Sequence, residues 1–296
     1  MNVAVIDVGS NSVRLLVARV SRASDVAQLQ RDRVYVRLGD DAYRLGRISD
    51  VKLEEARVVA RGFARSARKA GAKRLKTIVT APGRQSSNAG ELIRVLAAAT
   101  HAPVGLLSAE EEGCLAWEGA VAPLDDPPEV VAVVDLGGGS CELAVGTPAL
   151  GPVWVRSFDS GALRVTRAYL EGDPPPASSI ANARSEIDRL VSVETLPPRP
   201  DVTLAVGGTA RAIGRIVGRR FGVDRLEELA DTLSKVPAEK ATESFGVTPG
   251  RAETLLGGTL VLAKIARLVD TDLEVGRGGL REGAALALAR AEAAAA

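Results

Sequence analysis

Two short segments of this chain repeat one another 128 residues apart, and each combines residue types that suit phosphate chemistry. The first, VIDVGSNS, runs from Val5 to Ser12, and the second, VVDLGGGS, runs from Val133 to Ser140. An apolar run that ends in aspartate before a turn of small residues and serine is typical of a strand leading into a phosphate-binding loop. Small residues leave backbone N–H groups open to phosphate oxygens, and a carboxylate beside a phosphate suits a divalent metal ion. The pair predicts binding of phosphate and Mg2+ by two related domains that face one cleft.

A single loop of this kind would favour a simpler interpretation, an ordinary hairpin or strand-to-helix turn. Two copies in the same order, each with aspartate at the end of the strand, favour ligand binding instead. The reason is that ligands of open α/β sheets bind at the carboxyl ends of the strands.

The composition is that of an ordinary globular chain with room for two domains. Its 296 residues are 46% hydrophobic and 25% charged but only 3% aromatic, so alanine, valine, leucine and isoleucine must form the core. The net charge of +1 disfavours general nucleic-acid binding, and no apolar stretch approaches the ~20 residues of a membrane span. Cys114 and Cys141 match neither a metal-binding nor a redox spacing, which indicates a reducing, cytoplasmic setting.

Local signals predict the elements that must position these loops. Strands are expected over 2–8 and 13–20, on either side of the first loop. Ser49 begins a helix with apolar residues at helical spacing, and Ser108 is a natural N-cap for a helix that carries three consecutive glutamates.

The domain boundary is predicted at a proline-rich segment just before the second phosphate loop. We expect an N-terminal domain over 1–122 and a C-terminal domain over 123–296. A C-terminal helix over about 281–296 is expected to pack back on the first domain.

Five segments stand in a fixed order along nearly the whole chain: DVGSNSVRLLV (7–17), TAPGRQSSNAGE (80–91), SAEEEGCLAWEGA (108–120), VVDLGGGSCELAVG (133–146) and AVGGTARAIG (205–214). Together they resemble the exopolyphosphatase and guanosine-pentaphosphate phosphohydrolase (Ppx/GppA) family. The two loops alone indicate only the actin-like superfamily, and the acidic cluster between them narrows the resemblance to this family. It implies an α/β fold of two actin-like, ribonuclease H-like domains of the ASKHA superfamily with an interdomain cleft, and a homodimer.

The resemblance implies that Glu112 is the general base, because it stands where the family has a glutamate before a small residue. Hydrolysis of a phosphoanhydride needs an oriented water and stabilisation of the transferring phosphoryl, and no protein nucleophile. Glu110, Glu111 and Glu112 would also stabilise a helix N-terminus, and we expect this simpler role for at least one of them. Arg84 matches the arginine of the family's second motif, whose guanidinium suits phosphate oxygens; the alternative is a surface arginine in a turn.

Asp135 and Glu142 match the acidic pair of the second loop, where seven residues of separation across a turn let them converge on one ion. We expect Mg2+ there, with Mn2+ as an alternative, a monovalent cation as a further activator, and Asp7 as another metal or water contact. Asp135 is also counted among the catalytic residues. The expected phosphate-binding residues are Ser10, Asn11, Ser12, Gly137, Gly138, Gly139, Ser140, Gly207, Gly208 and Thr209.

Two departures from the family pattern concern the second motif and the chain length. This chain has Pro82 and Gly83 where the family usually has alanine and leucine, so the backbone before Arg84 is expected to differ. The chain also stops where longer members carry an additional helical domain of the HD-phosphohydrolase type.

A basic stripe follows the third glycine-containing segment. Arg211, Arg215 and Arg219 recur every four residues on a predicted helix, so they would share one face and meet a polyanion leaving the site. A solvated helix face explains the same spacing equally well.

Four functions follow, in order of preference. The first is an exopolyphosphatase that releases terminal phosphate from inorganic polyphosphate, and the second is a guanosine pentaphosphate 5′-phosphohydrolase that uses the same catalytic residues. The third, from another class, is a non-catalytic polyphosphate or alarmone-binding regulator, which would have no need of a base beside a metal. The fourth is a sugar or acetate kinase of the same superfamily, which the acidic cluster fits less well.

Overall fold

The computed structural model describes residues 1–21 and 25–295, so the last residue of the predicted helix over 281–296 lies outside the described part. Contacts along the chain define two compact units. Unit 1 combines Met1–Asp125 with Gly278–Ala296, and unit 2 is Asp126–Arg277.

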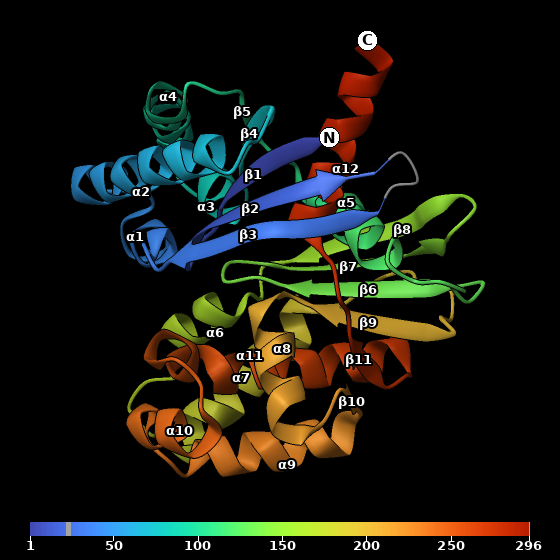
Figure 1. Ribbon diagram of the computed structural model, residues 1–296. Helices are drawn as coiled ribbons and strands as arrows, with labels where there is room; N and C mark the ends of the chain where they lie inside the picture. The colour runs from blue at the N-terminus through green and yellow to red at the C-terminus, as the bar shows by residue number, and fades with distance from the viewer. Residues whose placement is uncertain (22–24, 296) are drawn as a thin grey trace. The chain divides into compact units, whose positions relative to one another are not determined.

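Unit 1 is built on a mixed five-stranded sheet with the strand order β3-β2-β1-β4-β5 (Figure 1). Its first three strands form antiparallel pairs, whereas β4 is parallel to β1 and β5 is parallel to β4. The strands are β1 (Asn2–Val8), β2 (Val13–Val20), β3 (Val26–Val34), β4 (Arg74–Val79) and β5 (Val104–Leu106). The observed β1 and β2 confirm the two strands predicted over 2–8 and 13–20.

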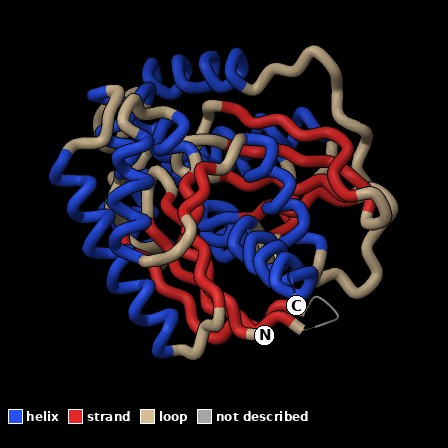
Figure 2. Tube along the Cα trace, turned by 90° about the horizontal axis from the view of Figure 1, so that it is seen from above, coloured by secondary structure: helices blue, strands red, loops and turns tan. Residues whose placement is uncertain are grey.

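Helices cover both faces of this sheet because β1 is apolar on both. Ala4, Ile6 and Val8 pack with α2 and α4, whereas Val3 and Val5 pack with α5 and α12. The helices of unit 1 are α1 (Leu38–Leu45), α2 (Asp50–Lys69), α3 (Ala81–Arg84), α4 (Ala89–Thr100), α5 (Ala109–Val121) and α12 (Leu280–Ala295). Figure 2 shows the start of β1 and the end of α12 at the same edge of the unit.

Both predicted helix caps of unit 1 are confirmed. The Ser49 hydroxyl accepts a hydrogen bond from the backbone N–H of Lys52 at the start of α2. Ser108 and Glu111 form a reciprocal capping box at the start of α5. Glu111 therefore has the structural role that was expected for at least one of the three glutamates.

Unit 2 contains a six-stranded sheet with the order β10-β11-β9-β6-β7-β8. Its centre is parallel, β11 beside β9 and β9 beside β6, and β6, β7 and β8 form an antiparallel meander. The strands are β6 (Val131–Leu136), β7 (Cys141–Thr147), β8 (Gly151–Phe158), β9 (Val202–Val206), β10 (Arg220–Phe221) and β11 (Leu273–Val275).

The long helix α11 (Pro249–Val269) is the centre of the helical packing in unit 2, and most of its side chains are buried. It contacts five other helices of the unit, which are α6 (Ala162–Tyr169), α7 (Ala177–Leu190), α8 (Gly207–Val217), α9 (Val223–Ser234) and α10 (Ala238–Phe245). No helix in the described ranges is both long enough and apolar enough to cross a membrane.

Candidate active site

The first phosphate loop is a closed turn between β1 and β2. The backbone N–H of Gly9 donates to the carbonyl of Ser12 at 3.2 Å, and Gly39 at the start of α1 donates to the carbonyl of Ser10 at 2.8 Å. Ser10, Asn11 and Ser12 are all more than nine-tenths buried. The buried Ser10 hydroxyl has no hydrogen-bond partner in the described part of the chain, so it can serve a ligand.

The second loop repeats this turn in unit 2. Gly137 donates to the carbonyl of Ser140 at 3.0 Å, the same bond as in the first loop. The carbonyls of Gly137 and Gly138 accept bonds from the first turn of α6, whose N–H groups would otherwise lack partners. Because the C=O and N–H of a planar peptide point in opposite directions, the N–H groups of Gly138 and Gly139 face away from α6. An anion on the side away from α6 could therefore accept hydrogen bonds from these two groups.

The third segment, Gly207 to Thr209, forms the first turn of α8. A Cβ on Gly207 would lie 3.0 Å from the Asp135 carboxylate, so this turn lies directly beside the second loop. Arg251 of α11 is only 6% exposed and donates to the Thr209 hydroxyl at 2.6 Å. Its guanidinium also approaches Gly208, where a Cβ would lie 2.5 Å from Nη2.

Sequence reasoning did not find Arg251. It stands 42 residues after Thr209 along the chain and belongs to no recognised segment. The one available signal is a lone arginine ahead of a long apolar stretch. A buried cation beside the Gly207 to Thr209 turn adds positive charge that would favour an anion there.

Asp135 and Glu142 face one another directly across β6 and β7. Glu142 is 1% exposed, and Ser157 donates to its Oε1 at 2.8 Å. Two carboxylates directly opposite on neighbouring strands repel each other, and a divalent cation with a preference for oxygen ligands would relieve that repulsion. The donor set therefore fits Mg2+.

Asp7 has different surroundings, although it occupies the corresponding place in unit 1. The cross-strand neighbour of Asp7 is Arg14, whereas the cross-strand neighbour of Asp135 is Glu142. Burial raises the pKa of the Asp7 carboxyl, and the charges of Arg14 and Arg281 act against that rise. Within residues 1–21 and 25–295, no three histidine, cysteine, aspartate or glutamate side chains are grouped to hold a metal ion. Asp7 lies in unit 1 and the other two expected ligands lie in unit 2.

Glu112 and Arg84 form an ion pair in unit 1. Arg84 Nη1 lies 2.7 Å from Glu112 Oε2 and also donates to the carbonyl of Leu107 at 3.1 Å. Glu112 is 5% exposed, whereas Glu110 and Glu111 are exposed. Of the three consecutive glutamates, Glu112 alone is buried next to a cation.

The proline and glycine before Arg84 are accommodated by a short helix, α3. Pro82 lies in its first turn, where no backbone donor is needed. Gly83 packs so closely that a Cβ would lie 2.6 Å from Leu106 and 2.7 Å from Val79.

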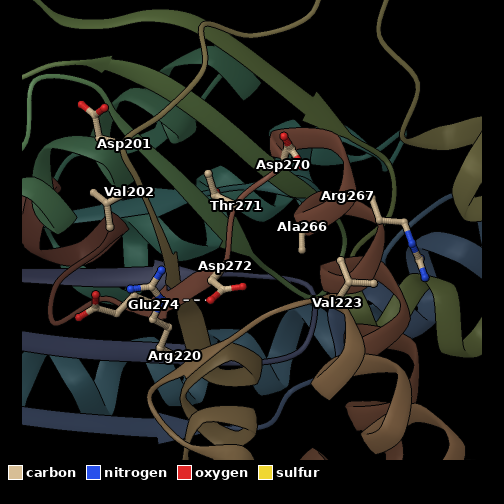
Figure 3. A pocket seen from close by; sticks show the side chains of 10 residues that line it. All are labelled: Asp201, Val202, Arg220, Val223, Ala266, Arg267, Asp270, Thr271, Asp272 and Glu274. Carbon is tan, nitrogen blue, oxygen red and sulfur yellow. Dashed lines mark hydrogen bonds and ion pairs between the residues drawn. The ribbon is translucent and has the colours of Figure 1, made fainter.

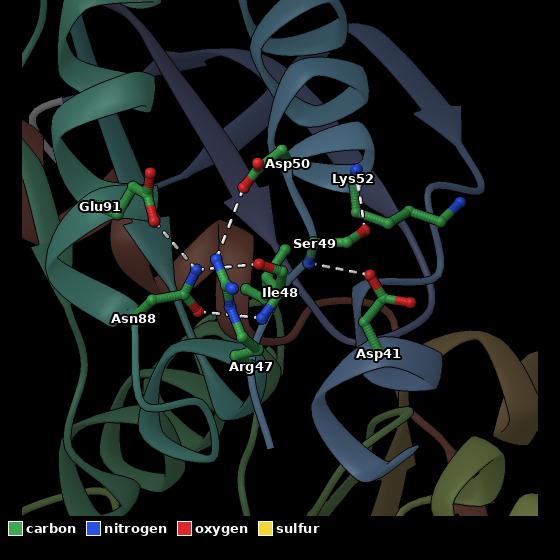
Figure 4. Close-up of polar contacts among 8 residues, drawn as sticks. All are labelled: Asp41, Arg47, Ile48, Ser49, Asp50, Lys52, Asn88 and Glu91. Atoms are coloured by element: carbon green, nitrogen blue, oxygen red, sulfur yellow. Dashed lines mark hydrogen bonds and ion pairs between the residues drawn. The ribbon is translucent and has the colours of Figure 1, made fainter. Parts of the chain in front are cut away.

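The segment after Arg84 is fastened to the start of α2. The Asn88 side chain accepts from the backbone N–H of Ile48 and donates to its carbonyl, both at 2.9 Å, and also donates to Glu91 (Figure 4). Asp41 accepts from the backbone N–H of Ser49 in the same group. The Asn88 contacts hold the end of the second motif beside the start of α2, and Arg84 pairs with Glu112 despite the departure from the family pattern.

Several known proteins are similar to this chain over nearly its whole length. The model of the Ppx/GppA phosphatase family matches residues 16–292. The chain belongs to the Ppx/GppA phosphatase family. It is 29% identical over 292 residues to Exopolyphosphatase 2 of Mycobacterium tuberculosis, with 90% of each chain covered. It is also 25% identical to Exopolyphosphatase 1 of Mycobacterium leprae, with 96% of this chain and 88% of that protein covered.

Solved structures of the Ppx/GppA family share the fold. A family member from Aquifex aeolicus superimposes with a TM-score of 0.82 at 25% identity, covering 99% of this chain and 98% of that one. An exopolyphosphatase-like protein superimposes with a TM-score of 0.91 at 25% identity over the same shares. The predicted α/β fold of the actin-like ASKHA type is confirmed, and the chain is a hydrolase of the phosphatase class.

The predicted arginine stripe was wrong in one respect. Arg211 and Arg215 lie on α8, but the helix ends at Val217 and Gly218 follows with a φ of +102°. Arg219 lies beyond this turn, and its guanidinium donates to the carbonyl of Val275 at 2.7 Å. Because the glycine ends the helix, Arg219 does not continue the helical face of the other two.

A separate pocket of about 600 Å3 opens in unit 2 beside the amino-terminal ends of β9 and β11 (Figure 3). The Gly207 turn follows the carboxyl-terminal end of β9, so the pocket lies at the opposite edge of the sheet. Four carboxylates and two guanidinium groups line it, a balance that disfavours phosphate. Its charged lining residues are Asp201, Arg220, Arg267, Asp270, Asp272 and Glu274.

Proposed function

We propose that this phosphatase is an exopolyphosphatase, which hydrolyses the terminal phosphoanhydride bond of inorganic polyphosphate. The observation that carries the proposal is the buried Glu112, held by Arg84, in a chain that also has two phosphate-type loops. Proteins named exopolyphosphatase are similar over almost their whole length, which supports the same substrate here.

Glu112 is proposed to accept the proton of the attacking water. The ion pair with Arg84 holds the carboxylate in place, and an oriented carboxylate can act as a general base. Arg84 orients that carboxylate and is proposed to place its positive charge near the oxygens of the transferring phosphoryl group. A fixed guanidinium stabilises the charge that develops there without any reorganisation at the moment of reaction.

Each loop is proposed to bind phosphate within its own unit. In unit 2, Gly138 and Gly139 supply backbone N–H donors, and in unit 1, Ser10 supplies a buried hydroxyl. Arg251 is proposed to add a positive charge beside Gly208 and Thr209, where oxygens of the next phosphate would bind.

Asp135 and Glu142 are proposed to hold Mg2+, because they are paired carboxylates on adjacent strands. When bound, the ion would supply charge stabilisation to phosphate oxygens. Ser157 fixes one oxygen of Glu142 and so limits the directions in which that carboxylate can point.

Phosphate release from short polyphosphate, long polyphosphate and guanosine pentaphosphate, with Mg2+, tests the proposal. We expect the wild-type protein to release phosphate from polyphosphate, and Glu112→Gln to be about 10²- to 10⁴-fold slower, the usual contribution of a general base. The matched control is Glu110→Gln, which removes an exposed carboxylate from the same turn of α5 and should leave the rate within twofold. Binding of polyphosphate without release from any substrate would favour a non-catalytic regulator.

One observation favours the guanosine pentaphosphate phosphohydrolase as a second candidate. Unit 2 has a pocket of about 230 Å3 with apolar walls from Leu170, Leu233, Val236 and Leu256. Ala252 of α11 also lines it, next to Arg251 in the chain, so one turn of α11 serves both the pocket and the phosphate-binding segment. An apolar slot is what a purine base needs. Faster release from guanosine pentaphosphate than from polyphosphate would support this alternative.

A further inference from the structure

Arg37 has an unusual backbone conformation next to the first phosphate loop. Its φ of 58° and ψ of 46° lie in the left-handed region, which few residues other than glycine, asparagine and aspartate adopt. Its neighbours Val36 and Leu38 are both buried in one core cluster, so the chain is anchored on each side of the strained residue. Arg37 is also the N-cap of α1, which places the strain where this helix begins.

Two N–H groups at the start of α1 bind the first phosphate loop. The N–H of Arg37 donates to the carbonyl of Asn11 at 3.1 Å, and the N–H of Gly39 donates to the carbonyl of Ser10 at 2.8 Å. The first N–H groups of a helix have no partner within the helix, and here the loop supplies one for Gly39. The loop and the start of α1 therefore hold one another through two hydrogen bonds.

These two bonds set the direction of the next N–H groups in the loop. The C=O and N–H of a planar peptide point in opposite directions, so the N–H groups of Asn11 and Ser12 point away from α1. Neither N–H donates to another group in the described part of the chain, although both residues are more than nine-tenths buried. The buried Ser10 hydroxyl also has no partner among residues 1–21 and 25–295. Three buried donors without protein partners in one turn indicate an anion as their ligand.

The second loop is held in a similar way but without a left-handed residue. Ala162 of α6 donates to the carbonyl of Gly137 at 3.0 Å. Gly161, the N-cap of α6, has an ordinary φ of −65°. Of the two loops, the first alone depends on a left-handed N-cap, so a residue that this conformation rejects should disturb the first loop.

We propose that Arg37 is a positioning residue, whose left-handed backbone holds the first phosphate loop in its anion-binding conformation. The role belongs to the backbone of Arg37 and not to its guanidinium group. The effect on the reaction rests on the proposed function, whereas the effect on the loop does not. A residue that tolerates the left-handed region should therefore replace Arg37, and a β-branched residue should not.

Two substitutions that both remove the guanidinium group test this role. Arg37→Asn introduces a residue that tolerates the left-handed region, and Arg37→Val introduces a β-branched residue that does not. We expect Arg37→Val to raise the KM for polyphosphate about tenfold with a smaller change in kcat, and Arg37→Asn to keep KM within about threefold of the wild type. Equal KM values for the two variants would overturn the proposal.

His101 offers a matched control, because it is also left-handed, with a φ of 50°, at the end of α4 in the same unit. It precedes β5, which runs parallel to β4 and β1, so it lies at the opposite edge of the sheet from the loop that follows β1. Arg37→Val and His101→Val should each lower the midpoint of thermal unfolding by about 2–4 °C. Only Arg37→Val should raise KM, and an equal rise for His101→Val would overturn the positioning role.

Hydrogen–deuterium exchange tests the loop without any reaction. In Arg37→Val, the amides of Gly9 and Gly39 should exchange at least tenfold faster than in the wild type, because both donate to loop carbonyls, and in Arg37→Asn they should not. Unchanged exchange in Arg37→Val would contradict the positioning role even in an active enzyme. A wild-type protein that releases no phosphate from any substrate would contradict the proposed function, and exchange would still decide the role of Arg37.

Discussion

At the scale of single residues, the proposed function depends on how the charges of Arg84 and Glu112 are held together. Arg84 Nη1 donates both to Glu112 and to the carbonyl of Leu107, so two acceptors fix the guanidinium beside the proposed base. A lysine at position 84 would keep the positive charge but would lack the planar guanidinium group. We expect Arg84→Lys to lower kcat for polyphosphate about 10²-fold, with a smaller change in KM.

The measurement is steady-state phosphate release, with Arg94→Lys as control because Arg94 is an exposed arginine of the neighbouring helix α4. Arg84→Lys with wild-type kcat would show that a point charge is sufficient and that the planar donor has no special role.

The sequence predicted Arg84 and Glu112 as candidates because both stand in recognisable segments. It could not predict that they touch, since 28 residues separate them and the contact depends on how α3 and α5 pack. Arg251 was missed for a related reason. A single arginine has no local signature, and only folding brings it to Thr209.

At the scale of elements, one carboxylate connects three helices of unit 2. Glu227 of α9 accepts from Arg184 of α7 at 2.9 Å and from Arg267 of α11 at 2.7 Å. These partners, the hydrogen bond from Arg184 first, lower the pKa of Glu227 below 4.5. A lowered pKa means that the pair stabilises the fold above pH 4.5 and loses this effect as the pH falls through the folded-state pKa.

We therefore expect Glu227→Gln to reduce the free energy of unfolding by about 1 kcal/mol at pH 7, and by much less at pH 3. Chemical denaturation at both pH values measures this difference. Glu228→Gln is the control, because Glu228 pairs only with the nearby, exposed Arg225 among the ion pairs of the described chain. A Glu227→Gln loss that is equal at both pH values would contradict the electrostatic explanation.

Elements with strong local signals were predicted well, and those without them were not. The hairpin β1–β2 and helix α2 follow from apolar runs, helical apolar spacing and the Ser49 cap. Strand β3 gave no such signal, because it is a largely exposed edge strand of mixed polar residues. The prediction that the α8 helix extends to Arg219 was wrong. The four-residue spacing of the arginines does not indicate that Gly218 ends the helix.

At the scale of the whole molecule, unit 1 is completed by the last residues of the chain. The chain leaves unit 1 after Asp125 and returns to it at Gly278. The returning helix contributes Leu280, Ala284 and Leu286 to the core on one face of the sheet. Apolar spacing predicts such a helix but not its neighbours, because no local pattern identifies the distant strand that it will cover.

A chain that ends at Arg277 should therefore lose the fold of unit 1. Removing α12 exposes the Val3 and Val5 face of β1, and each large apolar side chain left without its partners costs about 1.5–3 kcal/mol. Several such losses are comparable to the ~5–15 kcal/mol that stabilises a typical domain. We expect limited proteolysis to digest residues 1–125 of the truncated chain rapidly. A chain that ends at Glu292 is the control, because Ala293 and Ala294 are exposed and the ion pair of Glu292 with Arg74 is kept. Equal protease resistance of the two truncated chains would mean that unit 1 folds without its C-terminal helix.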